Sequence, residues 1–121
     1  MLEGVAFGVR DSLELLRGMG REAESARVSG GGARSSAWLQ IVASVLGLRL
    51  ETTAAEEGSA FGAALLGGVA GGVFADVHDA VARCVRVGAT IEPDPSQIPV
   101  YDQLYGRFRA LYPTLRRMEV T

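Results

Sequence analysis

Three consecutive glycines, Gly30 to Gly32, are the residues of this sequence whose type and spacing best suit ligand binding. Glycine removes side chains where a ligand could touch the backbone, and it permits backbone angles that other residues avoid. Residues 26–29 before them are expected to form a short strand, and Ser35 or Ser36 can cap a following helix. A helix start offers free N–H groups and a positive dipole end, which favour phosphate. The pattern is typical of a nucleotide or phosphate turn, although a tight strand-to-helix connection explains the glycines alone equally well.

Two common phosphate loops do not fit this turn. A Walker loop needs a lysine after its last glycine, whereas all 12 basic residues of the chain are arginine. The spacing also fails to match Gly-x-Gly-x-x-Gly. Any phosphate contact is therefore expected to come from backbone N–H groups rather than from a lysine.

Acidic residues and one histidine form two weaker candidate sites. Glu56 and Glu57 could act as paired carboxylates, but adjacent residues on a helix do not face each other, and acidic residues stabilise a helix start. His78 stands between Asp76 and Asp79, but further metal ligands do not follow nearby. We interpret the first pair as capping residues and the second group as a solvated helix start.

The aromatic residues are interpreted as packing residues. Trp38, shortly after the glycine turn, is expected to anchor the core rather than to stack on adenine. The aromatic and leucine residues between Tyr101 and Tyr112 recur at helical spacing and are expected to pack against a sheet. A sequence pI near 5.4 argues against a base-stacking surface for nucleic acid.

Composition limits the class of protein. The chain has 121 residues, is 48% hydrophobic and carries a net charge of −2, which indicates one small globular domain or part of a larger one. Cys84 is the only cysteine and lies on an apolar helical face, so we interpret it as a core residue in a reduced, intracellular protein. The uncharged stretch 58–75 approaches the length of a membrane span, but its glycine pairs favour a buried helix and loop.

Alternating helices and strands predict an α/β architecture. We expect helices over 2–17, 36–46, 56–66 and 76–87, strands over 26–29 and 48–53, a proline-rich loop from Pro93 to Pro99, and an aromatic helix that Pro113 kinks or ends. The apolar face of the first helix is expected to comprise Leu2, Val5, Ala6, Val9, Leu13 and Leu16. Two strands do not make a stable sheet, so further strands are expected upstream in a longer parent protein.

The residues around the glycine turn resemble the adenosine motif of the FGGY carbohydrate kinases, in particular the xylulokinase-like branch. The resemblance rests on Val28-Ser29-Gly30-Gly31-Gly32-Ala33-Arg34-Ser35-Ser36-x-Trp38-x-Gln40 followed by Leu46-Gly47. It extends to Met1–Phe7, Asp11-Ser12-Leu13, Glu57–Ala64 and the series Tyr101, Tyr105, Phe108, Leu111, Tyr112, Pro113. It therefore covers essentially the whole chain.

The resemblance implies an α/β fold that is part of the C-terminal domain of an actin-like ATPase (ribonuclease H-like) fold, helix-rich with a few strands. Residues 1–121 would be a partial C-terminal, ATP-binding domain, with 93–121 as a proline-rich loop plus C-terminal helix. Kinases of this family use Mg²⁺ and transfer the γ-phosphoryl of ATP to a sugar hydroxyl. The sequence of the motif is closest to the xylulokinase-like branch, which favours D-xylulose as the sugar.

The resemblance also implies which residues bind the nucleotide: Gly30, Gly31, Gly32, Ala33 and Ser35. Gly31 and Gly32 are expected to approach the adenosine and the α-phosphate. Ser35 stands where many relatives carry an asparagine that hydrogen-bonds the adenine, and a hydroxyl would replace that contact directly or through water, with less specificity.

The parts of such a kinase that perform the transfer are not expected in this chain. In the family the catalytic aspartate, the first phosphate loop and the sugar-binding residues lie in the N-terminal half. We therefore expect no catalytic residue and no metal ligand in this chain, and we expect the isolated fragment to be inactive. Its expected partners are ATP, a sugar and the missing N-terminal kinase domain. The expected location is the cytoplasm, and binding to nucleic acid or to a membrane is not expected. The alternative is a free-standing, non-catalytic module that uses the fold as a binding surface or as a homo-oligomer interface.

Overall fold

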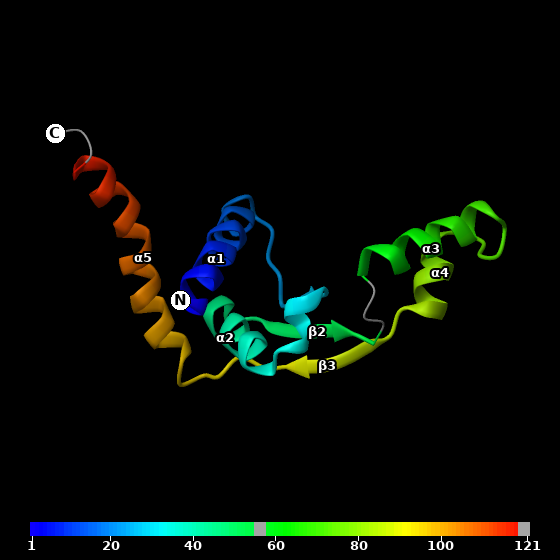
Figure 1. The fold of residues 1–121 in the computed structure, drawn as a ribbon, viewed down its shortest axis with the longest axis horizontal. Coiled ribbons are helices and arrows are strands. Elements are labelled where there is room, and N and C mark those ends of the chain that lie inside the picture. The colour runs from blue at the N-terminus through cyan, green and yellow to red at the C-terminus, as the bar shows by residue number, and fades with distance from the viewer. Residues whose placement is uncertain (55–57, 119–121) are drawn as a thin grey trace.

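The fold, seen in a computed structural model that describes residues 1–54 and 58–118, combines helices with a small sheet (Figure 1). In chain order the elements are α1 (Leu2–Gly18), β1 (Ser25–Val28), the short 3₁₀ helix η1 (Gly31–Arg34), α2 (Ser36–Leu46), β2 (Arg49–Thr53), α3 (Gly58–Ala70), α4 (Val77–Cys84), β3 (Val87–Ile91) and α5 (Ile98–Met118). The α/β architecture predicted from the sequence is confirmed.

The sheet has three strands in the order β1-β2-β3 within the described residues. β1 and β2 run parallel, with Ala26 opposite Leu50, and β3 runs antiparallel to β2. The prediction of a helix over 76–87 is wrong at its end, because α4 stops at Cys84 and Val87 begins β3. The Oγ1 of Thr52 accepts a hydrogen bond from the backbone N–H of Ala89 at 2.8 Å, which helps to hold this strand on β2.

Helix α2 forms as the sequence predicts and covers the sheet. The Oγ of Ser35 accepts the N–H of Trp38 at 3.3 Å, so a serine caps the helix start. Gly47 ends the helix with a φ of 63°, a left-handed conformation that glycine adopts without steric cost. The buried residues of α2 and of the strand after it form most of the core: Leu39, Val42, Ala43, Val45, Leu46, Leu48 and Leu50.

Helix α1 packs against α2 through a different face from the one predicted. Ala6 and Leu13 are buried as expected, and Phe7, which was not assigned to the apolar face, is buried too. Leu2, Val5, Val9 and Leu16 are exposed. The helical periodicity predicted α1 correctly, but it did not identify the buried face. Because α1 also packs against α5, Phe7 is buried between the two helices.

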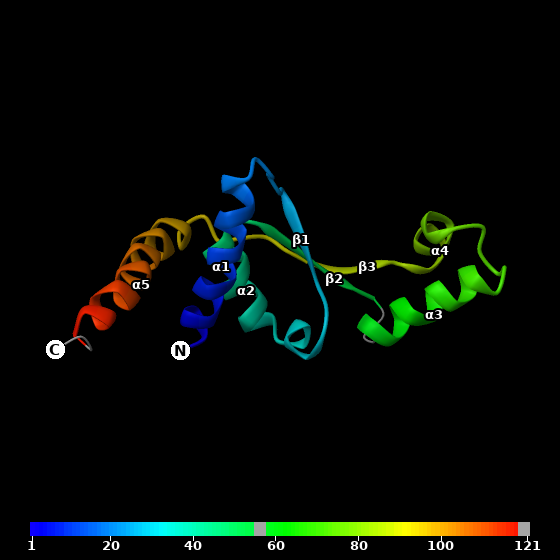
Figure 2. The same ribbon diagram turned by 90° about the horizontal axis from the view of Figure 1, so that it is seen from above.

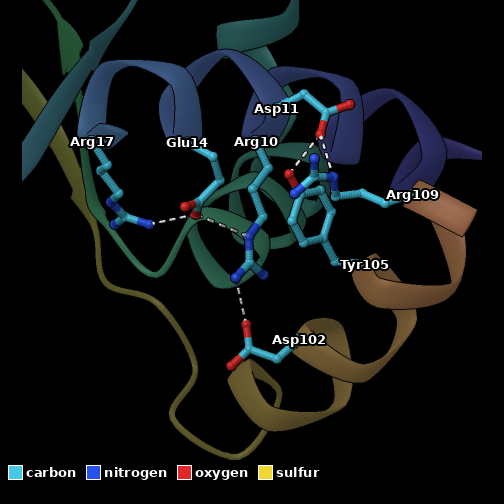
Figure 3. Close-up of polar contacts among 7 residues, drawn as sticks. All are labelled: Arg10, Asp11, Glu14, Arg17, Asp102, Tyr105 and Arg109. Atoms are coloured by element: carbon cyan, nitrogen blue, oxygen red, sulfur yellow. Dashed lines mark hydrogen bonds and ion pairs between the residues drawn. The ribbon is translucent and has the colours of Figure 1, made fainter. Parts of the chain in front are cut away.

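Helix α5 is fixed to α1 by aromatic and polar contacts. The ring of Phe7 lies 5.5 to 6.2 Å from the rings of Tyr101, Tyr105 and Phe108, so this stripe packs on a helix and not on a sheet as predicted. Figure 3 shows the polar contacts beside these rings: the hydroxyl of Tyr105 donates to Oδ1 of Asp11 at 2.6 Å, and Nη2 of Arg10 lies 2.6 Å from Oδ1 of Asp102. Arg10 also stacks its guanidinium on the ring of Tyr105. These contacts place the C-terminal helix beside α1.

Pro113 does not end α5, which continues to Met118. Residues 111–118 are exposed, so water can solvate the carbonyl that a helical proline leaves without its usual N–H donor. The expectation that this proline ends the helix is therefore wrong.

Helices α3 and α4 form a hairpin that projects beyond the strand ends (Figures 1 and 2). α3 runs through Gly67 and Gly68, where a break was expected. A Cβ on Gly68 would lie 2.6 Å from Cε2 of Phe74, so this glycine makes room for the ring that packs at the hairpin turn. Glu56 and Glu57, assigned to the start of this helix, lie outside the described residues. Within residues 1–54 and 58–118, no helix is long and apolar enough to cross a membrane.

Candidate functional site

The glycine turn begins where β1 ends. Gly30 has φ 91° and ψ −176°, a combination that is essentially confined to glycine. Its carbonyl accepts the N–H of Ala33 at 3.0 Å, and the carbonyl of Gly32 accepts the N–H of Ser35 at 3.2 Å. These bonds form η1, a turn of 3₁₀ helix that the sequence did not predict, which begins at Gly31, contains Gly32 and precedes α2. The glycines therefore form their own tight loop at the strand end.

The second and third glycines have different surroundings. A Cβ on Gly31 would meet no described residue within 4 Å apart from its chain neighbours, so residues 1–54 and 58–118 leave this side of the backbone uncovered. A Cβ on Gly32 would lie 3.2 Å from Nε1 and 3.4 Å from Cδ1 of Trp38. Gly32 thus packs on an indole that is partly buried against the core, which confirms the interpretation of Trp38 as a packing residue.

A cavity of about 200 Å³ lies beside the turn, at the carboxyl ends of β1 and β2. Its lining is polar and small: Ser29, Gly30, Ala33, Arg34, Thr52, Thr53 and Ala54. Parallel strands end at the same edge of a sheet, and ligands of open α/β sheets bind outside the carboxyl ends of the strands. The turn and the end of β2 therefore form one concave edge.

A second cavity of about 340 Å³ shares Ser29 and Thr53 with the first and extends toward the α3–α4 hairpin. Its remaining lining is mainly apolar, with arginines added: Arg27, Gly58, Phe61, Gly62, Leu65, Val81, Val85 and Arg86. The described lining of the two cavities includes Arg27, Arg34 and Arg86. Nη2 of Arg27 lies 3.4 Å from Oε2 of Glu51, so part of this charge is already paired. The smaller cavity is polar and the larger one mainly apolar, which suits a ligand with both kinds of surface.

The five predicted site residues divide into two groups. Gly30 and Ala33 line the smaller cavity, whereas Gly31, Gly32 and Ser35 do not. Ser35 caps α2 with its hydroxyl oxygen, and that oxygen still has a second lone pair and a proton to offer.

Sequence reasoning missed Thr52 and Thr53, which complete the concave edge from the neighbouring strand. Two hydroxyl residues at the end of a strand parallel to β1 are a signal that could have identified them. Oγ1 of Thr52 accepts the N–H of Ala89, which orients this side chain at the strand end.

The group around His78 is a helix start. Oδ1 of Asp76 accepts the N–H of Asp79 at 2.8 Å, and Oδ2 of Asp79 accepts the N–H of Ala75 at 3.1 Å. The two carboxylates thus cap α4 reciprocally. In the part of the chain that the structure describes, no three histidine, cysteine, aspartate or glutamate side chains gather to hold a metal ion. Cys84 is a free, partly buried thiol.

The fold is that of part of the C-terminal domain of an actin-like ATPase, as its similarity to solved sugar kinases shows. Xylulose kinase from Rhodospirillum rubrum superposes with a TM-score of 0.75 and 39% sequence identity, over 97% of this chain and 24% of that enzyme. Residues 1–71 match the FGGY family of carbohydrate kinases, C-terminal domain. The chain belongs to this family, as the motif around the glycine turn predicted.

Curated relatives match nearly the whole chain. The xylulose kinase of Staphylococcus epidermidis is 30% identical over 118 residues, which are 98% of this chain and 24% of that protein. The L-xylulose/3-keto-L-gulonate kinase of Escherichia coli is 34% identical over 94% of this chain and 23% of that protein. The chain therefore spans about a quarter of the length of these relatives.

Proposed function

We propose that this chain forms the adenosine side of the ATP site of a sugar kinase. The observation that carries the proposal is the backbone of Gly31, which no described residue beyond its neighbours covers, beside a concave sheet edge lined by small and polar residues. A cavity of about 200 Å³ is smaller than the roughly 300 Å³ or more of a typical ligand pocket, so the turn would form one wall of a larger site.

Each residue of the turn has a distinct role in this proposal. Gly31 and Gly32 let the backbone approach the adenosine and the α-phosphate, and Gly30 sets the direction of the loop through its positive φ. Ala33 adds a small wall to the cavity. The hydroxyl of Ser35 donates a hydrogen bond to the adenine, directly or through water, while its oxygen continues to cap α2.

The family assignment extends the proposal to the whole enzyme. Residues 1–121 form a partial C-terminal, ATP-binding domain, with 93–121 as a proline-rich loop and C-terminal helix. The enzyme transfers the γ-phosphoryl of ATP to a hydroxyl of D-xylulose in the cytoplasm, and Mg²⁺ neutralises charge on the transferred phosphate. The isolated chain is inactive, since the catalytic aspartate, the first phosphate loop and the sugar site belong to the missing N-terminal domain.

A chimera tests this proposal. Residues 1–121 would replace the corresponding quarter of the Rhodospirillum rubrum xylulose kinase, and phosphorylation of D-xylulose by ATP would be measured beside the isolated chain. We expect turnover by the chimera and none by the chain alone. A folded chimera that binds D-xylulose but not ATP would contradict the proposed nucleotide role.

Exposed apolar side chains support a second candidate function, a free-standing binding or assembly module. Eighteen large apolar side chains are exposed among the described residues, including Val5, Leu66 and Tyr112 on three different helices, and a free-standing module would cover such faces by association. Light scattering on the isolated chain distinguishes the two. A discrete homo-oligomer that binds no nucleotide favours the module, whereas a chain that needs the rest of a kinase to stay soluble favours the enzyme fragment.

A further inference from the structure

The apolar stripe of α5 continues beyond the part of the helix that packs on α1. Apolar residues recur three or four positions apart along the whole helix: Tyr101, Leu104, Tyr105, Phe108, Leu111, Tyr112, Leu115 and Met118. Tyr105 is buried against Phe7, whereas Leu111 and Leu115 are 56% and 57% exposed. In Figures 1 and 2 the C-terminal half of α5 runs away from α1. The stripe therefore has a partner at one end and none among the described residues at the other.

The two diverging helices leave a groove of about 720 Å³ between them. Leu15 of α1 lines it on one side, and Leu111, Tyr112 and Leu115 of α5 line it on the other. Side chains three and four residues apart form a ridge on a helix, and such ridges pack into the grooves of another helix. The shape and the spacing of this surface therefore suit a helical partner.

Asp11 and Glu14 of α1 also line the groove, and both side chains are partly exposed. All of their hydrogen bonds and ion pairs with described residues are made through one oxygen each, Oδ1 of Asp11 and Oε1 of Glu14 (Figure 3). Each carboxylate therefore keeps its second oxygen for a further donor, and charged acceptors form the stronger hydrogen bonds.

The C-terminal end of α5 carries donors that match these carboxylates. Residues 107–118 include four arginines and no acidic residue. Arg116 and Arg117 are exposed, and neither pairs with a carboxylate among residues 1–54 and 58–118. The helix end thus combines an apolar ridge with positive charge, and the groove combines apolar walls with available carboxylate oxygens. Because both belong to the same chain, two copies can exchange them.

We infer that the α1–α5 groove binds the C-terminal end of α5 from a second copy of this chain. The two α5 helices run antiparallel about a two-fold axis near Tyr112, and Leu111 and Leu115 of each copy pack between the helices of the other. Such an isologous contact uses every interaction twice, so a short helix end contributes two equivalent contacts. The inference does not depend on nucleotide binding.

The antiparallel arrangement also pairs the charges. With the axis at Tyr112, Arg116 of one copy lies at the level of Phe108 of the other, about 6 Å along the helix from the axis. Phe108 lines the groove together with Asp11 and Glu14, so the arginine reaches their second oxygens. A parallel arrangement would instead bring the arginines of the two copies together.

Two exposed apolar residues elsewhere serve as an internal control. Val5 of α1 and Leu66 of α3 are each 59% exposed, close to the exposure of Leu111 and Leu115. Neither lines the groove. A general tendency of apolar surface to associate would therefore depend on both pairs, whereas the proposed contact depends on only one.

Sedimentation equilibrium of the 121-residue chain tests the inference. We expect a dimer whose dissociation constant rises about a hundredfold or more with Leu111→Glu plus Leu115→Glu and less than about twofold with Val5→Glu plus Leu66→Glu. Circular dichroism should be unchanged in both variants, since all four side chains are exposed.

A double-mutant cycle tests the charge pairing. Arg116→Ala plus Arg117→Ala should weaken the dimer about tenfold, and Glu14→Gln should add little in that background, because its partner is already absent. Fully additive effects would show that Glu14 does not face these arginines and would contradict the antiparallel arrangement.

Crosslinking tests the position of the axis. In a Cys84→Ser background, which removes the only cysteine, a short bifunctional maleimide should link two copies carrying Tyr112→Cys but not two copies carrying Val5→Cys. A monomeric chain, an assembly that tolerates Leu111→Glu plus Leu115→Glu, or equal crosslinking at both positions would overturn the inference. Slow hydrogen exchange at residues 111–118 in a monomeric chimera would also overturn it, because the upstream part of the kinase would then occupy the groove.

Discussion

The α-carbon of Gly32 faces the edge of the Trp38 indole so closely that a methyl group there would lie 3.2 Å from the indole Nε1. Trp38 in turn packs against the core and gives its backbone N–H to the Ser35 hydroxyl. The loop proposed to bind ATP is thus held in place by a side chain of the helix that follows it. The position of the backbone at the turn depends on this packing as well as on the glycines.

This contact predicts the effect of a larger residue at Gly32. Gly32→Val would push the indole away, and we expect the KM for ATP of the chimera to rise about tenfold or more, equivalent to about 1.4 kcal/mol. Tryptophan emission of the isolated 121-residue chain should also shift with Gly32→Val, since Trp38 is its only tryptophan. An unchanged KM together with a shifted emission would show that the turn does not contact nucleotide.

Gly30 is predicted to be required for stability, because its φ of 91° with an extended ψ disfavours any side chain. We expect Gly30→Ala to lower the free energy of unfolding by about 1–3 kcal/mol. Denaturant titration of the chimera measures this change. A loss of less than about 0.5 kcal/mol, the usual range of a neutral surface change, would contradict the conformation of the turn.

Ser35 allows its capping role to be separated from its proposed adenine contact. Ser35→Ala should cost about 1 kcal/mol of stability, whereas Ser35→Asn should retain the cap, because asparagine is an equally good N-cap. An amide can both donate to and accept from the adenine edge, so Ser35→Asn is expected to raise the preference for ATP over GTP. Ser36→Ala, one residue further along, is the matched control. If the wild type and Ser35→Asn prefer ATP over GTP to the same extent, residue 35 does not contact the adenine.

Tyr105 makes the stability of the α1–α5 contact depend on pH. Burial, together with its hydrogen bond to Asp11, raises the pKa of Tyr105 to about 12 from an ordinary value of 10.0. The folded state therefore holds the phenol proton more tightly than the unfolded state, and stability should fall as the pH rises from about 10 to about 12. The chain has no lysine, so tyrosines dominate titration in this range, and burial also raises the pKa of Tyr101.

The matched variants for this prediction are Tyr105→Phe and Tyr112→Phe. Tyr105→Phe should cost about 1.5 kcal/mol at neutral pH, the low end for a hydrogen bond to a charged group, because Asp11 is partly solvated. It should also flatten the loss of stability between pH 10 and 12. Tyr112 is largely exposed, so its replacement should change neither quantity. Equal behaviour of the two variants would refute the role of the Tyr105–Asp11 bond.

Local signals predicted the elements that surround the turn. Ser35 and Gly47 mark the two ends of α2, and both residues perform the capping that their types indicate. At the end of α1, Gly20 has a φ of 75°, a left-handed conformation that commonly terminates a helix. The glycine turn was placed correctly between β1 and α2 because these boundaries depend on neighbouring residues only.

Tertiary contacts account for the features that the sequence did not reveal. Val87 continues the helical spacing of α4, but Gly88 lies against Oγ1 of Thr52, and pairing with β2 makes this segment a strand. Gly68 lies within α3, and the Phe74 ring occupies the space that a side chain at this position would need. Thr52 and Thr53 join the candidate site only through the parallel pairing of two strands separated by α2. The strand pairings join residues far apart in the chain, so neither segment alone shows which residues will face each other.

Gly31→Ala in the chimera tests the central claim most directly, because a Cβ at this position meets no described residue within 4 Å apart from its chain neighbours. The added methyl should leave the free energy of unfolding unchanged or raise it by up to about 1 kcal/mol. If the backbone of Gly31 lies against the adenosine and α-phosphate, isothermal titration should show ATP affinity about tenfold or more below wild type, equivalent to about 1.4 kcal/mol. Wild-type ATP affinity in a fully folded Gly31→Ala chimera would contradict the assignment of this turn to the nucleotide.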